Sequence, residues 1–259
     1  MNRIQALFQR KPQQVLNLYF TAGYPQLDDT RPIIRALTEA GADLIEIGMP
    51  FSDPIADGGT IQASNQVALR NGITLTRIFE QLAGIREETD LPLLLMGYLN
   101  PVLQYGLTRF IDQAAAVGID GLILPDLPMY EYQTQYRAQV EANGLSNVFL
   151  VTPQTSEARI HEIDAVSQGF IYVVSTDSTT GRSSGFGPQQ IAYFERIQAM
   201  NLRNPTLIGF GIHDHATYQA ATQYANGAII GSAFIKALQG PGDLADKTRT
   251  FVQGIRGGA

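Results

Sequence analysis

Glu46 is the residue whose type is least expected at its place in the sequence. It lies near the end of an alternating, mostly apolar run, residues 43 to 48, which is typical of a β-strand. The alternation puts Glu46 on one face of that strand, together with Leu44 and Gly48. Charged side chains are seldom buried without a partner, so a glutamate at an apolar strand end suggests chemistry.

Two aspartates, Asp53 and Asp57, follow this strand in a segment that two prolines keep out of regular structure. The pair Gly58-Gly59 lets the segment turn sharply before a helix pattern begins at residue 60. A carboxylate on a rigid strand end, with others on an adjoining loop, is suited to general acid–base catalysis. The alternative is that both aspartates are ordinary loop and cap residues, which is a common use of aspartate.

The elements that must position these residues form a regular alternation of strands and helices. Short apolar runs predict eight strands, at residues 15–20, 43–48, 91–97, 120–124, 147–151, 169–174, 206–210 and 228–230. The helix patterns between them include residues 102–117 and 130–142, and Ile4, Leu7 and Phe8 predict a short additional helix at the start. Continuous apolar strands are typical of a parallel sheet that is covered on both faces.

Eight such repeats in about 250 residues predict an α/β fold, a (β/α)8 TIM barrel with a short extra N-terminal helix. We expect one catalytic domain over residues 1–259. A doubly wound sheet is the alternative architecture. In a barrel, the active site is built from the loops after the strand carboxyl ends, which is where the unusual residues cluster here.

Composition limits the classes of function. The 259 residues carry a formal net charge of −6 and the sequence pI is about 5.0, which argues against nucleic acid or an anionic membrane as partner. The chain has no cysteine, which excludes disulfides and thiolate chemistry. The polar start lacks the apolar core of a signal peptide, and no apolar run approaches the length of a membrane span. We therefore expect a soluble, cytoplasmic protein.

Small and hydroxyl-bearing residues gather after the last three predicted strands. They read Ser178-Thr179-Thr180-Gly181, Gly209-Phe210-Gly211 and Gly231-Ser232. In a barrel, the loops after the seventh and eighth strands often hold a phosphate with backbone N–H groups and a helix N-terminus. A net-acidic protein could bind an anion in this way without a basic cluster. The alternative is that these glycines only permit tight turns.

Aromatic and apolar side chains also stand near strand ends, and together they predict a flat apolar pocket beside the phosphate site. They are Tyr19, Met96, Tyr98, Tyr172 and Phe210. Each one taken singly is more simply explained as a core residue, which is the usual place of an aromatic side chain.

Two other kinds of chemistry lack suitable residues. A Schiff-base aldolase needs a lysine in the barrel, but the lysines fall outside the predicted strands, at Lys11, Lys236 and Lys247. The histidines form no set with carboxylates that resembles a metal site; they are His161, His213 and His215. The residues thus predict a metal-free barrel enzyme that uses carboxylates on a phosphorylated, partly aromatic substrate.

The sequence resembles the tryptophan synthase alpha chain family, in the same order and over nearly its whole length. The most specific segment reads Pro-Phe-Ser-Asp-Pro-Ile-Ala-Asp-Gly, at residues 50–58. The other segments that carry the resemblance are residues 96–101 with Tyr105-Gly106, residues 125–128, residues 209–211 and residues 231–232.

This resemblance implies a lyase of tryptophan biosynthesis that cleaves indole-3-glycerol phosphate to indole and D-glyceraldehyde 3-phosphate. Glu46 matches the family's strand-end glutamate, implied to protonate indole C3 and to move the glycerol hydroxyl proton. Asp57 matches the loop aspartate, implied to bind the indole N–H. The implied pocket residues are Tyr19, Met96, Tyr98, Tyr172 and Phe210. The implied phosphate-binding residues are Gly181, Gly211, Gly231 and Ser232, with Thr180 matching the loop beside Gly181.

The resemblance also implies a partner. Family members hold no cofactor themselves and work with a pyridoxal-phosphate beta chain, as an α2β2 heterotetramer, which condenses indole with serine. Six residues match the family's beta-chain contacts: Pro50, Phe51, Asp53, Asn100, Pro101 and Pro128.

Two positions depart from the family pattern. Gly59 replaces the usual proline after Asp-Gly, which should loosen the catalytic loop. The long loop has Ser178-Thr179 where the family has Gly-Val. Two other functions stay open: a silent phosphosugar-binding or scaffolding barrel, and a solitary enzyme that releases free indole. Binding phosphate requires neither Glu46 nor Asp57, so their presence argues against the silent barrel.

Overall fold

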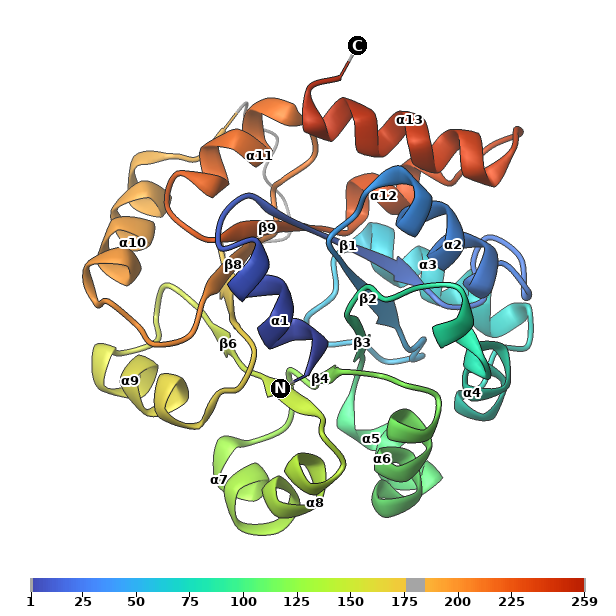
Figure 1. Cartoon of the computed structure of the whole chain (residues 1–259), viewed down its shortest axis with the longest axis horizontal. Coiled ribbons are helices and arrows are strands. Elements are labelled where there is room, and N and C mark those ends of the chain that lie inside the picture. The colour runs from blue at the N-terminus through green and yellow to red at the C-terminus, as the bar shows by residue number, and fades with distance from the viewer. Residues whose placement is uncertain (1, 176–184, 259) are drawn as a thin grey trace.

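The strands form one parallel sheet that curls into a barrel ringed by helices (Figure 1). The computed structural model describes residues 2–175 and 185–258. Within this part of the chain the sheet order is β5-β4-β3-β2-β1-β9-β8-β7-β6. The strands are β1 (Val15–Thr21), β2 (Leu44–Gly48), β3 (Leu93–Met96), β4 (Gly121–Ile123), β5 (Ser146–Val148), β6 (Leu150–Val151), β7 (Ile171–Val174), β8 (Thr206–Gly209) and β9 (Gly227–Ile230).

The barrel closes through the predicted fifth strand, which divides into β5 and β6 at Phe149. β5 pairs with β4 on one side, and β6 pairs with β7 on the other. The backbone carbonyl of Phe149 accepts a hydrogen bond of 3.0 Å from Tyr172 of β7. Because one continuous stretch of chain bridges both ends of the sheet, the predicted eight-stranded barrel is confirmed with one strand in two pieces.

The helices cover the outside of the barrel, and one lies across its end. They are α1 (Arg3–Arg10), α2 (Thr30–Ala40), α3 (Gly59–Arg70), α4 (Leu75–Leu82), α5 (Leu99–Tyr105), α6 (Leu107–Ala116), α7 (Met129–Glu131), α8 (Arg137–Ala142), α9 (Glu157–Val166), α10 (Pro188–Ala199), α11 (His215–Thr222), α12 (Ser232–Ala237) and α13 (Leu244–Arg256). A 3₁₀ turn, η1 (Ile85–Glu87), follows α4, and a π-helical segment, η2 (Tyr132–Tyr136), joins α7 to α8.

Two predicted helices differ in detail from those observed. The pattern over residues 102–117 forms two helices, because Gly106 between α5 and α6 has a positive φ of 94°, which a glycine adopts readily. The pattern over residues 130–142 contains the π-helical segment, whose wider turn no apolar spacing signals.

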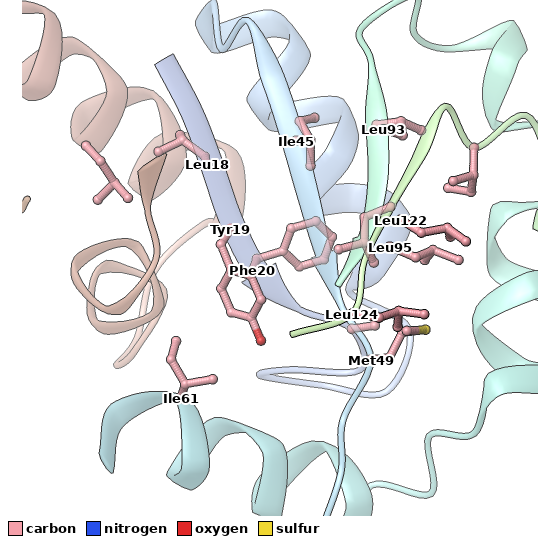
Figure 2. Packing of buried hydrophobic residues seen from close by; sticks show 14 of the residues in the cluster. Leu18, Tyr19, Phe20, Ile45, Met49, Ile61, Leu93, Leu95, Leu122 and Leu124 are labelled. Atoms are coloured by element: carbon pink, nitrogen blue, oxygen red, sulfur yellow. The ribbon is translucent and has the colours of Figure 1, made fainter. Parts of the chain in front are cut away.

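The core has an inner and an outer layer, divided by the barrel wall. Leu44 packs inside the barrel with residues such as Leu94 and Leu207, whereas Ile45 and Ile47 pack with the outer helices. Figure 2 shows part of the outer layer around Ile45 and Phe20. The alternation predicted for β2 is therefore confirmed, and it turns Glu46 toward the barrel interior with Leu44.

Helix α1 closes the N-terminal end of the barrel, inside the ring of outer helices (Figure 1). Its buried residues Ile4 and Leu7 join the inner layer. Asn2 caps the helix and also donates a hydrogen bond of 2.7 Å to the Ser146 hydroxyl at the start of β5. The predicted N-terminal helix is thus a plug, which leaves the carboxyl-end rim as the open end of the barrel.

Candidate active site

Glu46 is wholly buried on the inner face of β2, where its carboxyl group has one hydrogen-bond partner within residues 2–175 and 185–258. The side-chain amide of Asn17, on the neighbouring strand β1, donates to Glu46 Oε1 at 2.5 Å. Among the described residues, Glu46 Oε2 has no partner. Burial raises the pKa of Glu46 to about 8, against the opposing effect of the Asn17 hydrogen bond, so the group can hold a proton near neutral pH.

Asp57 lies in the loop between β2 and α3, partly exposed at the rim. Its Oδ2 accepts a hydrogen bond of 3.3 Å from the side-chain amide of Asn65, a residue of α3. Burial raises the pKa of Asp57 to about 6, while hydrogen bonds from Asn65 and Tyr98 act in the opposite direction. The two carboxyl groups thus have different pKa values, which lets one donate a proton while the other stays charged.

Tyr98 fixes the loop that carries Asp57. Its hydroxyl accepts a hydrogen bond of 2.9 Å from the backbone N–H of Ala56, directly before Asp57. Its ring lies 5.4 Å from the Phe51 ring, centroid to centroid. Both contacts tie the β2–α3 loop to the start of α5, which Tyr98 precedes.

Two tyrosines, one on β1 and one on β7, line the barrel mouth near Glu46, and each lies over a glycine of the next strand. A Cβ on Gly48 would stand 2.1 Å from the Tyr19 hydroxyl oxygen. A Cβ on Gly209 would stand 2.3 Å from that of Tyr172. Only glycine leaves room for these rings, and Figure 2 shows Tyr19 extending from β1 on the side of Ile61.

The other predicted pocket residues stand at the ends of the neighbouring strands. Phe210 follows β8 with a positive φ of 69°, and its ring lies 6.2 Å from the Tyr172 ring. Met96 ends β3, where it is half-buried between the inner and outer layers. Burial also raises the pKa of both Tyr19 and Tyr172 well above the usual value, so these hydroxyls stay neutral.

The predicted phosphate-binding residues are only partly described. Gly211 follows β8 with a φ of 76°, and Gly231 and Ser232 follow the neighbouring strand β9, at the start of α12. A Cβ on Gly231 would lie 3.3 Å from the Tyr19 ring, so this turn adjoins the aromatic pocket. Thr180 and Gly181 lie outside the described residues.

Two amides that hold the carboxyl groups were not predicted from the sequence. Asn17 stands two residues before Tyr19, on the same face of β1. Asn65 lies within α3, the helix that follows the loop with Asp57. The alternation of β1 could have shown that Asn17 points inward. Neither pairing was visible, because strand register and loop path decide which carboxyl group each amide meets.

The lysines lie away from this site. Lys11 pairs with Asp43 at 2.7 Å, and Lys247 donates to backbone carbonyls, among them Leu238 O at 3.2 Å. Lys236 is an exposed residue of α12. In the described ranges, no group of three or more histidine, aspartate or glutamate side chains could hold a metal ion. No helix there is long and apolar enough to cross a membrane.

Fold and site together define a class: an α/β barrel with a buried glutamate inside its mouth and a partly exposed aspartate on the loop that follows the same strand. The family profile described as "Tryptophan synthase alpha chain" matches residues 5–255. The chain belongs to this family.

Individual relatives agree with the family profile. The tryptophan synthase alpha chain of Flavobacterium johnsoniae is 56% identical over 256 residues, which cover 99% of this chain and 100% of the relative. That of Bacteroides thetaiotaomicron is 51% identical, over 92% of this chain and 93% of the relative. The crystal structure of tryptophan synthase subunit alpha from Legionella pneumophila superposes with a TM-score of 0.88 at 31% identity, covering 99% and 98% of the two chains.

The resemblance seen in the sequence is therefore confirmed. The chain is a lyase, and its family reaction is the cleavage of indole-3-glycerol phosphate, with indole passing to a beta chain.

Proposed function

We propose that Glu46 and Asp57 carry out this cleavage without a cofactor in the chain itself. The observation that carries the proposal is the pair of carboxyl groups at one barrel mouth, with pKa values of about 8 and about 6. At neutral pH the first is largely protonated and the second largely ionised, so the pair offers an acid and an anion at once.

The first step breaks the aromaticity of the indole ring. Glu46 gives its proton to indole C3, which forms a C–H bond and leaves positive charge on the ring nitrogen. Asp57 accepts the N–H of that ring and stabilises the charge, as a fixed anion in a partly buried site does effectively.

The second step breaks the carbon–carbon bond. The Glu46 carboxylate removes the proton of the hydroxyl on the carbon attached to C3. That carbon becomes an aldehyde, and the electrons of the broken bond return to the ring. The products are indole and D-glyceraldehyde 3-phosphate, Glu46 is protonated again, and the step needs no oxidant or reductant.

The pocket residues suit the substrate's two ends. Tyr19, Tyr172 and Phe210 would enclose the flat indole ring, with Met96 and Tyr98 beside it. The backbone N–H groups around Gly211, Gly231 and Ser232 would meet the phosphate, since these turns adjoin the aromatic pocket. Thr180 and Gly181 are proposed to complete the phosphate-binding end.

The test is turnover of indole-3-glycerol phosphate by the purified chain and by Asp57→Asn. Released indole and glyceraldehyde 3-phosphate should appear in equal amounts with the native chain. Asp57→Asn should lower kcat by about 10²–10³, because a fixed anion facing developing charge is removed. Borohydride added during turnover should leave the mass of the chain unchanged. A reduced adduct on Lys236, or turnover by Asp57→Asn near the native rate, would contradict the proposal.

We further propose a cytoplasmic α2β2 complex with a pyridoxal-phosphate beta chain, docked over the barrel rim. The resemblance assigns Pro50, Phe51, Asp53, Asn100, Pro101 and Pro128 to this contact. Exposed apolar side chains support it: Ile55, Leu103 and Tyr130 are 86%, 47% and 70% exposed. They belong to the segments that follow three neighbouring strands, β2, β3 and β4, so a partner seated there would cover all three.

A further inference from the structure

We propose that Asn17 is a positioning residue for the cleavage reaction: its amide holds one oxygen of Glu46 and so reserves the other oxygen for the transferred proton. This inference rests on the proposed role of Glu46 and deepens it. It concerns the orientation and the protonation site of the carboxyl group, neither of which Glu46 sets by itself.

Strand register places Asn17 behind Glu46, on the side away from the rim. β1 and β2 are parallel, with Tyr19 opposite Glu46 and Asn17 opposite Leu44. Asn17 therefore stands one inward-facing level nearer the closed end of the barrel than Glu46. Its amide nitrogen reaches Glu46 Oε1 at 2.5 Å, and both residues are wholly buried. The hydrogen bond therefore holds the carboxyl group from the side of the closed end of the barrel.

The pair is poorly suited to a purely structural role. Among the described residues, Asn17 Oδ1 and Glu46 Oε2 are both buried without a hydrogen-bond partner. Each such atom has lost its hydrogen bonds to water without replacement, which lowers the stability of the fold. The residues paired with Asn17 on either side, Leu44 and Ile229, are apolar members of the inner layer. An apolar side chain at position 17 would continue that layer without the cost, so the amide's role lies with Glu46.

The amide also selects the oxygen that carries the proton. An amide N–H only donates, so Oε1 must offer it a lone pair. In neutral Glu46 the proton then sits on Oε2, which has no hydrogen-bond partner in the part of the chain that the structure describes. After Oε2 protonates indole C3, the same N–H stabilises the carboxylate. Oε2 is then the free acceptor for the hydroxyl proton, so one oxygen gives and receives both protons.

Removing the amide should also change the protonation equilibrium. The Asn17 hydrogen bond lowers the pKa of Glu46 against the larger effect of burial. Burial, and to a lesser degree Glu46 itself, raises the pKa of Tyr19 of β1 and of Tyr172 of β7, so both hydroxyls stay neutral. Without Asn17, no described donor favours the anion, and the pKa of Glu46 should rise.

The experiment compares Asn17→Leu with a matched control, Asn147→Leu. Asn147 is also a buried asparagine of a barrel strand, and its Oδ1 likewise has no partner among the described residues, but no hydrogen bond joins it to Glu46 there. Asn17→Leu should lower kcat about 10- to 100-fold, since the carboxyl loses its fixed orientation, while KM changes less than about threefold. The alkaline limb of its kcat/KM profile should move to higher pH. Asn147→Leu should leave kcat and this limb near the native values.

A second variant, Asn17→Asp, keeps the side-chain shape and separates positioning from packing. It replaces the donor with a second carboxyl group, and a like charge beside Glu46 should move the alkaline limb further upward than Asn17→Leu does. If Asn17→Leu does not fold, this variant decides the question. An unmoved limb with kcat within about threefold of native in the folded variants would overturn the inference, as would equal losses in Asn147→Leu.

Failure of this inference can be told from failure of the proposed function. If Glu46→Gln keeps native turnover, the role of Glu46 itself is wrong. If Glu46→Gln is inactive while Asn17→Leu and Asn17→Asp behave as the native chain does, only the role of Asn17 is wrong.

Discussion

At the scale of single residues, the different protonation states of Glu46 and Asp57 set the pH range of activity. The reaction starts with Glu46 protonated and Asp57 ionised. Activity should therefore fall as the pH rises through the Glu46 pKa of about 8, and fall again as the pH drops through the Asp57 pKa of about 6. A bell-shaped kcat/KM profile measured on the isolated chain checks this, because kcat/KM reports the free enzyme. A profile that is flat from pH 5 to 9 would contradict it.

The sequence predicted the residues of the site better than their partners. Glu46 was identified by a charge in an apolar strand, and its position inside the barrel follows from alternation in β2. Its hydrogen bond to Asn17 could not be foreseen, because it depends on the register between β1 and β2. The need for glycine at positions 48 and 209 could not be predicted for the same reason. The side chain that would clash there, Tyr19 or Tyr172, belongs to a neighbouring strand.

At the scale of elements, the start of α3 controls the loop that carries Asp57. Gly59 is the first residue of the helix, and Gly58 before it is extended, with φ −70° and ψ 161°. That is the conformation a residue before proline requires, and a Cβ at Gly59 would meet no atom within 4 Å. The first helical position also tolerates the loss of an N–H. Although this chain has glycine at position 59, its backbone there could therefore also accommodate the family's proline.

Gly59→Pro should accordingly raise the free energy of unfolding by about 0.4–1 kcal/mol, because it restricts the unfolded chain. It should also lower hydrogen exchange in residues 52–58. Gly72→Pro is the control: its surroundings are equally open, but its φ is 91°, so proline there should destabilise the chain. Denaturant unfolding of both variants checks the prediction, and an equal effect at the two positions would contradict it.

At the same scale, patterns fixed the order of elements more securely than their ends. The strands and helices appear in the predicted order, but the helix pattern over residues 102–117 breaks at Gly106, which has a positive φ. The fifth strand divides at Phe149 because the sheet changes partner there, from β4 to β7. Such a change depends on closure of the whole barrel and leaves no local signal.

At the scale of the whole molecule, an ionic cluster at the closed end of the barrel joins α1 to the strands. Asp120, buried before β4, bonds Arg86 at 2.5 Å and Arg3 of α1 at 3.1 Å. It also accepts a hydrogen bond of 2.9 Å from the backbone N–H of Leu93. This one carboxylate thus ties together the N-terminal plug, η1 and the start of β3.

Asp120→Ala should therefore lower the free energy of unfolding by about 3–5 kcal/mol, because it leaves the partly buried Arg86 without its ion pair. Asp28→Ala removes a carboxylate that is 74% exposed from its pair with Arg77, and should change stability far less. Chemical denaturation of both variants at neutral pH gives the comparison. Similar losses in the two would contradict the role assigned to Asp120.

The rim of the barrel should bind the beta chain. Asp53 is exposed in the β2–α3 loop, close in sequence to Ile55 and Asp57. Asp53→Lys should weaken the stimulation of turnover by a beta chain more than it changes the basal rate. Glu162→Lys, a matched charge reversal on the outer helix α9, should leave the stimulation intact. Sedimentation that shows no complex at micromolar concentration, together with unstimulated turnover, would contradict the docking proposal.

The central claim is that Glu46 moves the protons of the cleavage reaction, and Glu46→Gln tests it most directly. The amide keeps the size of the side chain but can neither give nor take the proton. Single-turnover cleavage of indole-3-glycerol phosphate should slow by about 10²–10⁴, while the substrate's Kd, measured by calorimetry, stays close to the native value. Cleavage by Glu46→Gln within a few-fold of the native rate would contradict the claim.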